Sequence, residues 1–103
     1  MNSLEIELIT KIFECKVKKT GYINIQSYEN AAIARDEERI YELKLLEIND
    51  ISLNIESEYL HIERKIRMNE YFNNNFGIDY PNNMNSENSK SFLRQLKIQK
   101  LGL

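Results

Sequence analysis

The chain has 103 residues, of which 42% are hydrophobic and 29% are charged. A chain of this length fits one domain, and its apolar content is too high for an intrinsically disordered protein. It contains only three glycines and one proline. This scarcity disfavours turn-rich β architectures, and we expect an all-α fold of about four helices.

The first residues carry Glu5 and Glu7 where a secretion signal would be basic, and no apolar run approaches the roughly 20 residues of a membrane span. The single cysteine, Cys15, cannot form a disulfide within the chain. These features predict a cytoplasmic protein in a reducing compartment.

The net charge of −2 is unevenly distributed along the chain. Residues 26–79 hold twelve acidic and six basic residues, whereas residues 80–103 hold one acidic residue, Glu87, and four basic ones. This asymmetry indicates either that the two regions dock onto each other or that the basic tail meets an acidic partner.

The first helix is predicted over residues 3–19, because apolar residues recur there at helical spacing and lysines gather at its end. Gly21 is expected to end it, and residues 20–26 read as an extended connector. The second helix is predicted from Tyr28 to Glu47, with Ser27 as its N-cap and no glycine or proline inside.

A third helix is predicted over residues 53–74, after a break at residues 49–50. Residues 51–55 alternate like a strand, so the first turn of this helix is left open. The predicted domain organisation has three parts: a helical core over residues 1–76, an Asn-rich loop over residues 77–89, and a basic amphipathic helix over residues 90–103, capped by Ser89.

The sequence offers little catalytic chemistry. His61 is the only histidine and is interpreted as a surface residue, and Cys15 as a semi-buried small hydrophobe. Charged residues of the second helix alternate in sign three and four residues apart, which is typical of a solvated face: Arg35, Glu37, Glu38, Arg39, Glu42 and Lys44. No phosphate-binding loop, nucleophile elbow or metal-ligand spacing is present. We therefore expect no enzyme activity, no cofactor and no metal.

One segment resembles a known motif. Residues 27–43 read SYENAAIARDEERIYEL and resemble the UVR motif, in which an aromatic residue and Glu are followed by paired alanines and Arg-Asp. The matching positions are Tyr28, Glu29, Ala31, Ala32, Arg35 and Asp36. Small residues such as these alanines also allow a second helix to approach closely.

The UVR motif forms an antiparallel helical hairpin used for protein contacts in bacterial excision-repair nuclease subunits, Clp-type ATPases and their adaptors. The resemblance implies a bacterial or phage protein with an N-terminal hairpin, in which Ala31 and Ala32 set the helix spacing. Tyr28, Glu29, Arg35, Asp36 and Arg39 would contact the partner. A UVR hairpin has a very short turn, whereas the connector expected at residues 21–26 is longer.

Three functions follow as hypotheses. The first is a non-enzymatic adaptor or inhibitor that binds another protein of the Clp-type ATPase or repair-nuclease class through the hairpin. The second is a small regulator that binds nucleic acid with its basic tail, whose candidate residues are Lys90, Arg94, Lys97 and Lys100. The third is a homo-oligomer that sequesters a small ligand between protomers near Tyr59, Arg67 and Tyr71.

Overall fold

The structure is a computed structural model that describes the backbone of residues 3–101 and the side chains of residues 3–98. The described part of the chain forms four helices: α1 (Ser3–Asn24), α2 (Tyr28–Ile48), α3 (Leu60–Phe76) and α4 (Ser86–Leu101). This result confirms the predicted all-α fold. Within these residues, no helix is sufficiently long and apolar to cross a membrane.

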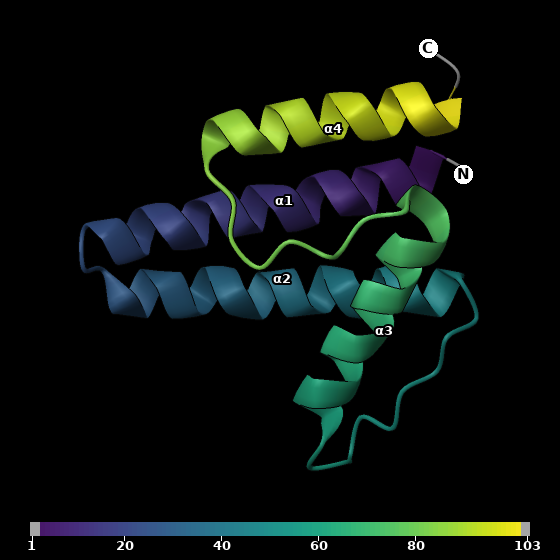
Figure 1. Cartoon of the computed structure of the whole chain (residues 1–103). Helices are drawn as coiled ribbons and strands as arrows, with labels where there is room; N and C mark the ends of the chain where they lie inside the picture. Colours follow the sequence, from purple (N-terminus) through teal and green to yellow (C-terminus); the bar gives the residue numbers. More distant parts are fainter. Residues whose placement is uncertain (1–2, 102–103) are drawn as a thin grey trace.

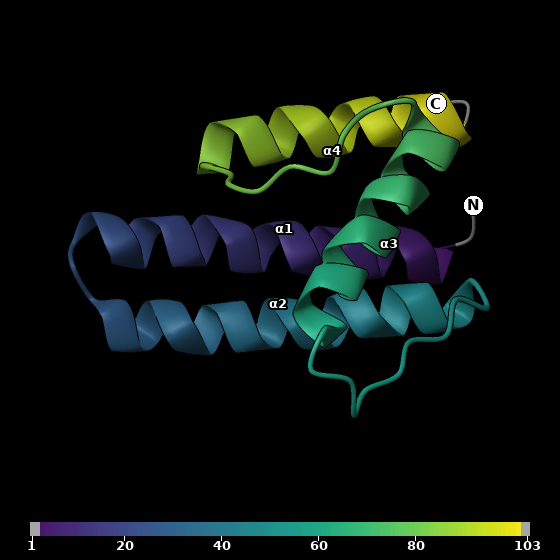
Figure 2. The same cartoon turned by 60° about the horizontal axis from the view of Figure 1, so that its bottom comes forward.

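The four helices are arranged around α1. Helices α1 and α2 run antiparallel as a close hairpin, as predicted, and α4 lies along α1 on the side away from α2 (Figure 1). Helix α3 crosses the hairpin steeply near the middle of α2, as Figure 2 shows from a second direction. The turn of the hairpin extends beyond the other elements at one end of the molecule, whereas the start of α1 and the end of α4 lie at the other end.

The core is an aromatic and aliphatic cluster to which all four helices contribute. Phe72 of α3 is fully buried at its centre. Its ring lies 6.1 Å from that of Phe13 in α1, 6.4 Å from that of Phe92 in α4 and 4.9 Å from that of Tyr80 in the loop before α4, measured between centroids. Tilted and edge-on aromatic pairs at such separations are favourable beyond their buried area.

The connector predicted after residue 20 is wrong. Helix α1 continues through Gly21 to Asn24, and the turn consists of residues 25–27. Gln26 takes a left-handed conformation with φ of 59°, and the Ser27 amide donates to the carbonyl of Tyr22 at 2.8 Å. Packing of the two helices along their length outweighs the roughly 1 kcal/mol by which a glycine disfavours a helix interior. The hairpin turn is therefore three residues long, shorter than the expected connector.

The third helix begins at Leu60, seven residues later than predicted. Side chains in the preceding segment bond to nearby backbone amides instead: Asn54 Oδ1 accepts from the amide of Glu56 at 3.1 Å, and Ser57 Oγ accepts from that of Tyr59 at 3.1 Å. Such local bonds compete with helix formation. Residues 51–54 are neither strand nor helix, although Ile51 and Leu53 pack against the core.

The fourth helix begins at Ser86 instead of Lys90. Asn85, not Ser89, has the capping role, because its Oδ1 accepts from the amide of Asn88 at 2.8 Å. Ser89 is buried inside the helix. Met84 and Leu96 are buried in the same cluster as the first three helices, so the core extends beyond residue 76 and the last helix is part of it.

Truncation of Phe72 tests this account of the core. Phe72→Ala should lower the free energy of unfolding by about 3–5 kcal/mol, because it removes a fully buried ring and leaves a cavity among several aromatic neighbours. Urea denaturation followed by circular dichroism measures the change. The control Ile66→Ala lies on the same helix with its side chain 49% exposed, and it should cost less than about 1 kcal/mol. Equal losses for the two variants would contradict a core centred on Phe72.

Candidate functional site

The charged face predicted for α2 is partly buried. Glu38 and Glu42, which were expected to be solvated, are each only 5% exposed. They lie one helical turn apart on the side of α2 that also buries Ala31, Ala34 and Leu45. Two carboxylates in such a position need charged or hydrogen-bonding partners from other elements, because burial of an unpaired charge is very unfavourable.

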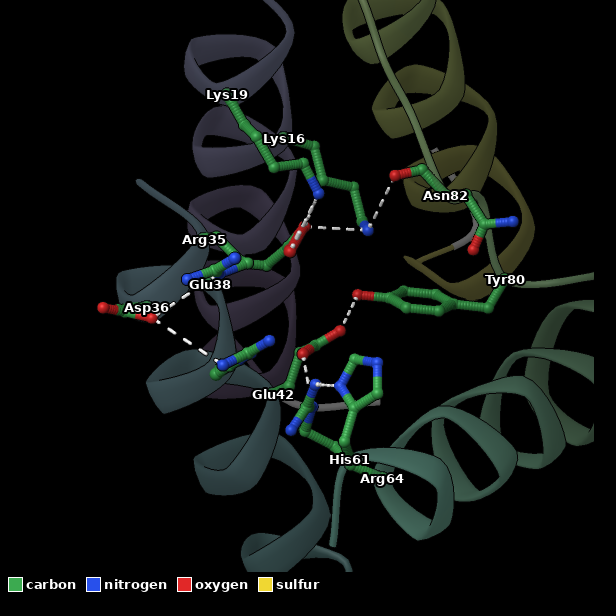
Figure 3. Close-up of polar contacts among 11 residues, drawn as sticks. Lys16, Lys19, Arg35, Asp36, Glu38, Glu42, His61, Arg64, Tyr80 and Asn82 are labelled. Carbon is green, nitrogen blue, oxygen red and sulfur yellow. Dashed lines mark hydrogen bonds and ion pairs between the residues drawn. The ribbon is translucent and has the colours of Figure 1, made fainter. Parts of the chain in front are cut away.

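Glu38 is paired with two lysines of α1. Its Oε1 lies 2.8 Å from Nζ of Lys16, and its Oε2 lies 3.2 Å from Nζ of Lys19. Lys16 is itself buried, with its ammonium group 4.4 Å from the centre of the Tyr80 ring and 3.5 Å from the carbonyl oxygen of Asn82. These contacts join α1, α2 and the loop before α4 around one ammonium group (Figure 3).

Glu42 is paired with Arg64 of α3. Nε of Arg64 donates to Oε1 of Glu42 at 3.0 Å, and the hydroxyl of Tyr80 donates to Oε2 in a short hydrogen bond. Nη2 of Arg64 also lies 2.9 Å from Nδ1 of His61, which can accept this bond in its neutral form. Figure 3 shows these side chains converging from α2, α3 and the loop onto Glu42.

Burial and neighbouring charges shift the pKa values of several groups in this cluster. Burial lowers the pKa of the Lys16 ammonium group and raises the pKa of the Glu42 carboxyl group, and the neighbouring opposite charges oppose both shifts. Desolvation lowers the pKa of His61, and Arg64 and Lys65 lower it further.

A pocket of about 210 Å³ opens beside these buried carboxylates. Two carboxylates, Glu38 and Glu42, line it together with six basic side chains: Lys16, Lys19, Arg35, Arg39, Arg64 and Lys65. His61, Tyr80, Asn82 and Asn83 complete the lining. We call this cavity the basic pocket, since its walls carry an excess of four positive charges.

The residues predicted to contact a partner fall into two groups. Tyr28 and Glu29 are exposed at the start of α2, next to the hairpin turn. Arg35 and Arg39 line the basic pocket about two turns further along the helix. Asp36 forms a long ion pair with each arginine, because its Oδ1 lies 3.7 Å from Nε of Arg35 and 3.8 Å from Nη1 of Arg39.

The two alanines predicted to set the helix spacing differ in burial. Ala31 is 6% exposed against α1, whereas Ala32 is only half-buried. Ala34, which the resemblance does not include, is the other alanine buried in the hairpin, at 3% exposure. The close approach of the two helices therefore depends on the spacing of Ala31 and Ala34.

A second notable surface lies at the hairpin turn. Three large apolar side chains are exposed there: Ile23 by 45%, Ile25 by 73% and Tyr28 by 64%. We call this group the hairpin tip. Because the turn extends beyond α3 and α4 in both views (Figure 1, Figure 2), none of those helices covers it.

The other predicted sites are more dispersed. Lys90, Arg94 and Lys97 are exposed on one side of α4, and Lys100 lies outside the described side chains. Tyr59, Arg67 and Tyr71 do not form a shared cluster: Tyr71 is buried and donates to Glu5 at 2.7 Å, and Arg67 pairs with Glu70 on the surface at 2.9 Å. His61 is exposed, as predicted, whereas Cys15, which was predicted to be semi-buried, is a fully buried free thiol. Among residues 3–98, no three potential ligand side chains gather where they could hold a metal ion.

The buried phenol of Tyr80 gives the cluster a testable pH dependence. Burial and then the Glu42 carboxylate raise the pKa of Tyr80 well above its ordinary value of 10.0. A tyrosine of the unfolded chain ionises near pH 10, whereas Tyr80 stays protonated in the folded state. Stability is therefore retained below about pH 10 and lost as the pH rises above it, by up to about 1.4 kcal/mol per pH unit for this group.

Urea denaturation between pH 7 and about 11 measures this loss. Tyr80→Phe should make the alkaline decline shallower than in the wild type, although its stability at pH 7 is lower because Glu42 loses a donor. Tyr59→Phe, at an exposed tyrosine, should leave the decline unchanged. An absorbance titration in which Tyr80 ionises near pH 10 while the helices stay intact would contradict the assignment.

No protein-family model matches the chain, and no curated protein or solved structure is significantly similar to it.

Proposed function

We propose that this chain is a non-catalytic protein-interaction module, an adaptor or inhibitor, that binds its partner with the tip of the α1–α2 hairpin. The exposure of Ile23, Ile25 and Tyr28 at that tip is the observation that carries the proposal. Single exposed apolar residues are common, but three gathered on a protruding turn form a patch of the kind that marks interaction sites.

The anatomy of the tip fits recognition of another protein. An aromatic side chain flanked by aliphatic ones can fill a partner's pocket, and a tyrosine does so at a small cost in conformational entropy. Glu29 stands beside this anchor and adds a charge at the edge of the patch, where polar contacts usually set orientation. The rigid helices behind the tip keep the contact residues ordered before binding, which reduces the entropy lost on association.

The partner class is proposed by analogy with the UVR motif. Tyr28 and Glu29 are both part of the UVR-like segment, and in that motif the hairpin contacts Clp-type ATPases or excision-repair nuclease subunits. The three-residue turn and the buried Ala31 support the comparison. The buried thiol of the single cysteine fits the cytoplasmic location proposed from the sequence.

A matched pair of double variants tests the proposal. Ile25→Glu with Tyr28→Ala should weaken binding to a purified Clp-type ATPase or excision-repair nuclease subunit at least tenfold, about 1.4 kcal/mol, because it removes the apolar anchor and adds a charge. Ile55→Glu with Tyr59→Ala changes the same residue types at similar exposures of 72% and 58%, but in the segment before α3. This control should bind as the wild type does.

Biolayer interferometry measures the affinities, and circular dichroism checks that each variant is folded. Absence of binding by the wild type to both partner classes would overturn the proposed partners. Equal weakening by the tip and control variants would overturn the role of the tip. Loss of wild-type dimers in the tip variant alone, seen by analytical ultracentrifugation, would instead identify the tip as a homo-oligomer contact.

A second function is supported by the placement of three basic residues on one side of α4. Lys90, Arg94 and Lys97 are exposed there, and such a row can bind the phosphates of a nucleic acid without sequence specificity. We propose nucleic-acid binding as the alternative. Affinity for duplex DNA or RNA should then fall steeply with salt, and Lys97→Glu should abolish it. Salt-independent binding in a fluorescence-anisotropy titration would exclude this alternative.

A further inference from the structure

We propose that the basic pocket is a binding site for the dianionic phosphate group of a phosphate monoester. The pocket lies on the side of α2 that faces α3, about two helical turns from the hairpin tip, so this inference does not depend on the proposed protein contact. Figure 3 shows the side chains of its polar wall.

Positive charge outweighs negative charge in the lining of the pocket. Of its six bases, Lys16, Lys19 and Arg64 form ion pairs with the two buried carboxylates, Lys16 and Lys19 sharing Glu38. Arg35, Arg39 and Lys65 remain. Asp36 offsets only part of the charge of the two arginines, at distances of 3.7 and 3.8 Å. Three bases at the mouth of one small cavity with a single flanking carboxylate form a site for an anion.

The side chain of Arg39 includes a hydrogen-bond donor that is not satisfied within the part of the protein that the structure describes. Nε of Arg39 is buried and has no acceptor among the described residues, although this side chain lines the pocket. A buried N–H group without an acceptor is rare in native proteins. An anion bound against Arg39 would give its guanidinium group an acceptor, and this planar group is well suited to pair with two oxygens of a phosphate.

Other cationic and hydrogen-bond-donating residues also line the pocket. Lys65 has no carboxylate within ion-pair distance in the part of the chain that the structure describes. Asn82 and Asn83 are also among the residues that line the pocket, and the side-chain amide of an asparagine can donate hydrogen bonds without adding charge. His61 accepts from Arg64 through Nδ1, so its proton lies on Nε2 and can also be donated. A phosphate group is tetrahedral and has several acceptor oxygens, so it can accept hydrogen bonds from more of these donors than a planar carboxylate can.

The size of the cavity limits the ligand. Pockets that enclose whole drug-sized ligands usually measure roughly 300–1,000 Å³, whereas this one encloses about 210 Å³. It therefore accommodates the phosphate group and the first atoms attached to it, and the remainder of the ligand extends toward solvent. The floor formed by Glu38 and Glu42 limits how deeply an anion enters, so the phosphate is held at the mouth by Arg35, Arg39 and Lys65.

The test titrates the whole chain with inorganic phosphate, glycerol phosphate and a nucleoside 5′-monophosphate, at an ionic strength held constant with chloride. NMR of the arginine Nε–H signals reports on the site directly. We expect the Arg39 signal to shift and saturate with each phosphate, and not with the unphosphorylated nucleoside or glycerol. Equal affinities for the three ligands would mean that the phosphate group alone is recognised, and a tighter nucleotide would mean that the base contributes.

A charge-matched pair of variants separates the pocket from general surface charge. Arg35→Gln with Arg39→Gln should weaken phosphate binding at least tenfold, because it removes two of the three bases at the mouth of the pocket. Lys18→Gln with Lys44→Gln removes the same charge at exposed lysines that do not line the pocket, and it should bind phosphate as the wild type does. Thermal denaturation confirms that both variants are folded.

Three results would overturn the proposal. The first is an Arg39 signal that does not respond to any of the phosphates. The second is a response that never saturates or that chloride reproduces, since this would indicate screening only. The third is equal weakening in the two double variants, which would place binding on the general positive surface.

Discussion

The burial of Glu38 and Glu42 is the constraint on which the arrangement of the helices depends. Both carboxylates lie on the inner face of α2, so each requires a cation from another element. Lys16 comes from α1, Arg64 comes from α3, and Tyr80 from the loop before α4 contacts both pairs through its ring and its hydroxyl. An apolar contact tolerates small shifts, whereas a buried ion pair loses most of its attraction if one partner moves away. The cluster therefore fixes the crossing of α3 over the hairpin more narrowly than the aromatic core alone would.

Much of the fold could be predicted from periodicity. Leu8, Ile9, Ile12 and Phe13 recur at helical spacing and are buried along α1, and the uninterrupted run after Ser27 forms α2. The ends of helices were harder to predict, because they depend on which local side chain bonds to the backbone. Asn54, Ser57 and Asn85 take those bonds here, and any of several Asn and Ser residues nearby would have been an equally reasonable choice. Gly21 was expected to end α1, but a helical partner alongside overrides local preference.

The basic pocket could not be predicted, because its residues look like a solvated helix face. Charges of opposite sign three and four residues apart occur both on exposed helices and at the edge of a buried cluster. The sequence nevertheless contains a weak indication that some of these charges are buried. Lys16 falls in register with the apolar stripe of α1, and Glu38 and Glu42 share a face with Ala31, Ala34 and Leu45. Charged residues in register with apolar ones on two adjacent helices indicate a buried pair, but the partners Arg64 and Tyr80 come from segments whose positions only the fold reveals.

The composition of the pocket also affects the stability of the folded state. Buried ion pairs are often no more stabilising than apolar residues of the same volume, so stability alone does not explain two such pairs beside three further bases. Like charges at this spacing repel one another, which disfavours the folded state. A bound dianion would reverse that repulsion, and a ligand at about one hundred times its dissociation constant would stabilise the fold by about 2.7 kcal/mol. Since Arg64 and Lys65 belong to α3 and Arg35 and Arg39 belong to α2, the same ligand would also tighten the contact between these helices. Occupancy of the pocket would thereby hold α3 more firmly against the hairpin.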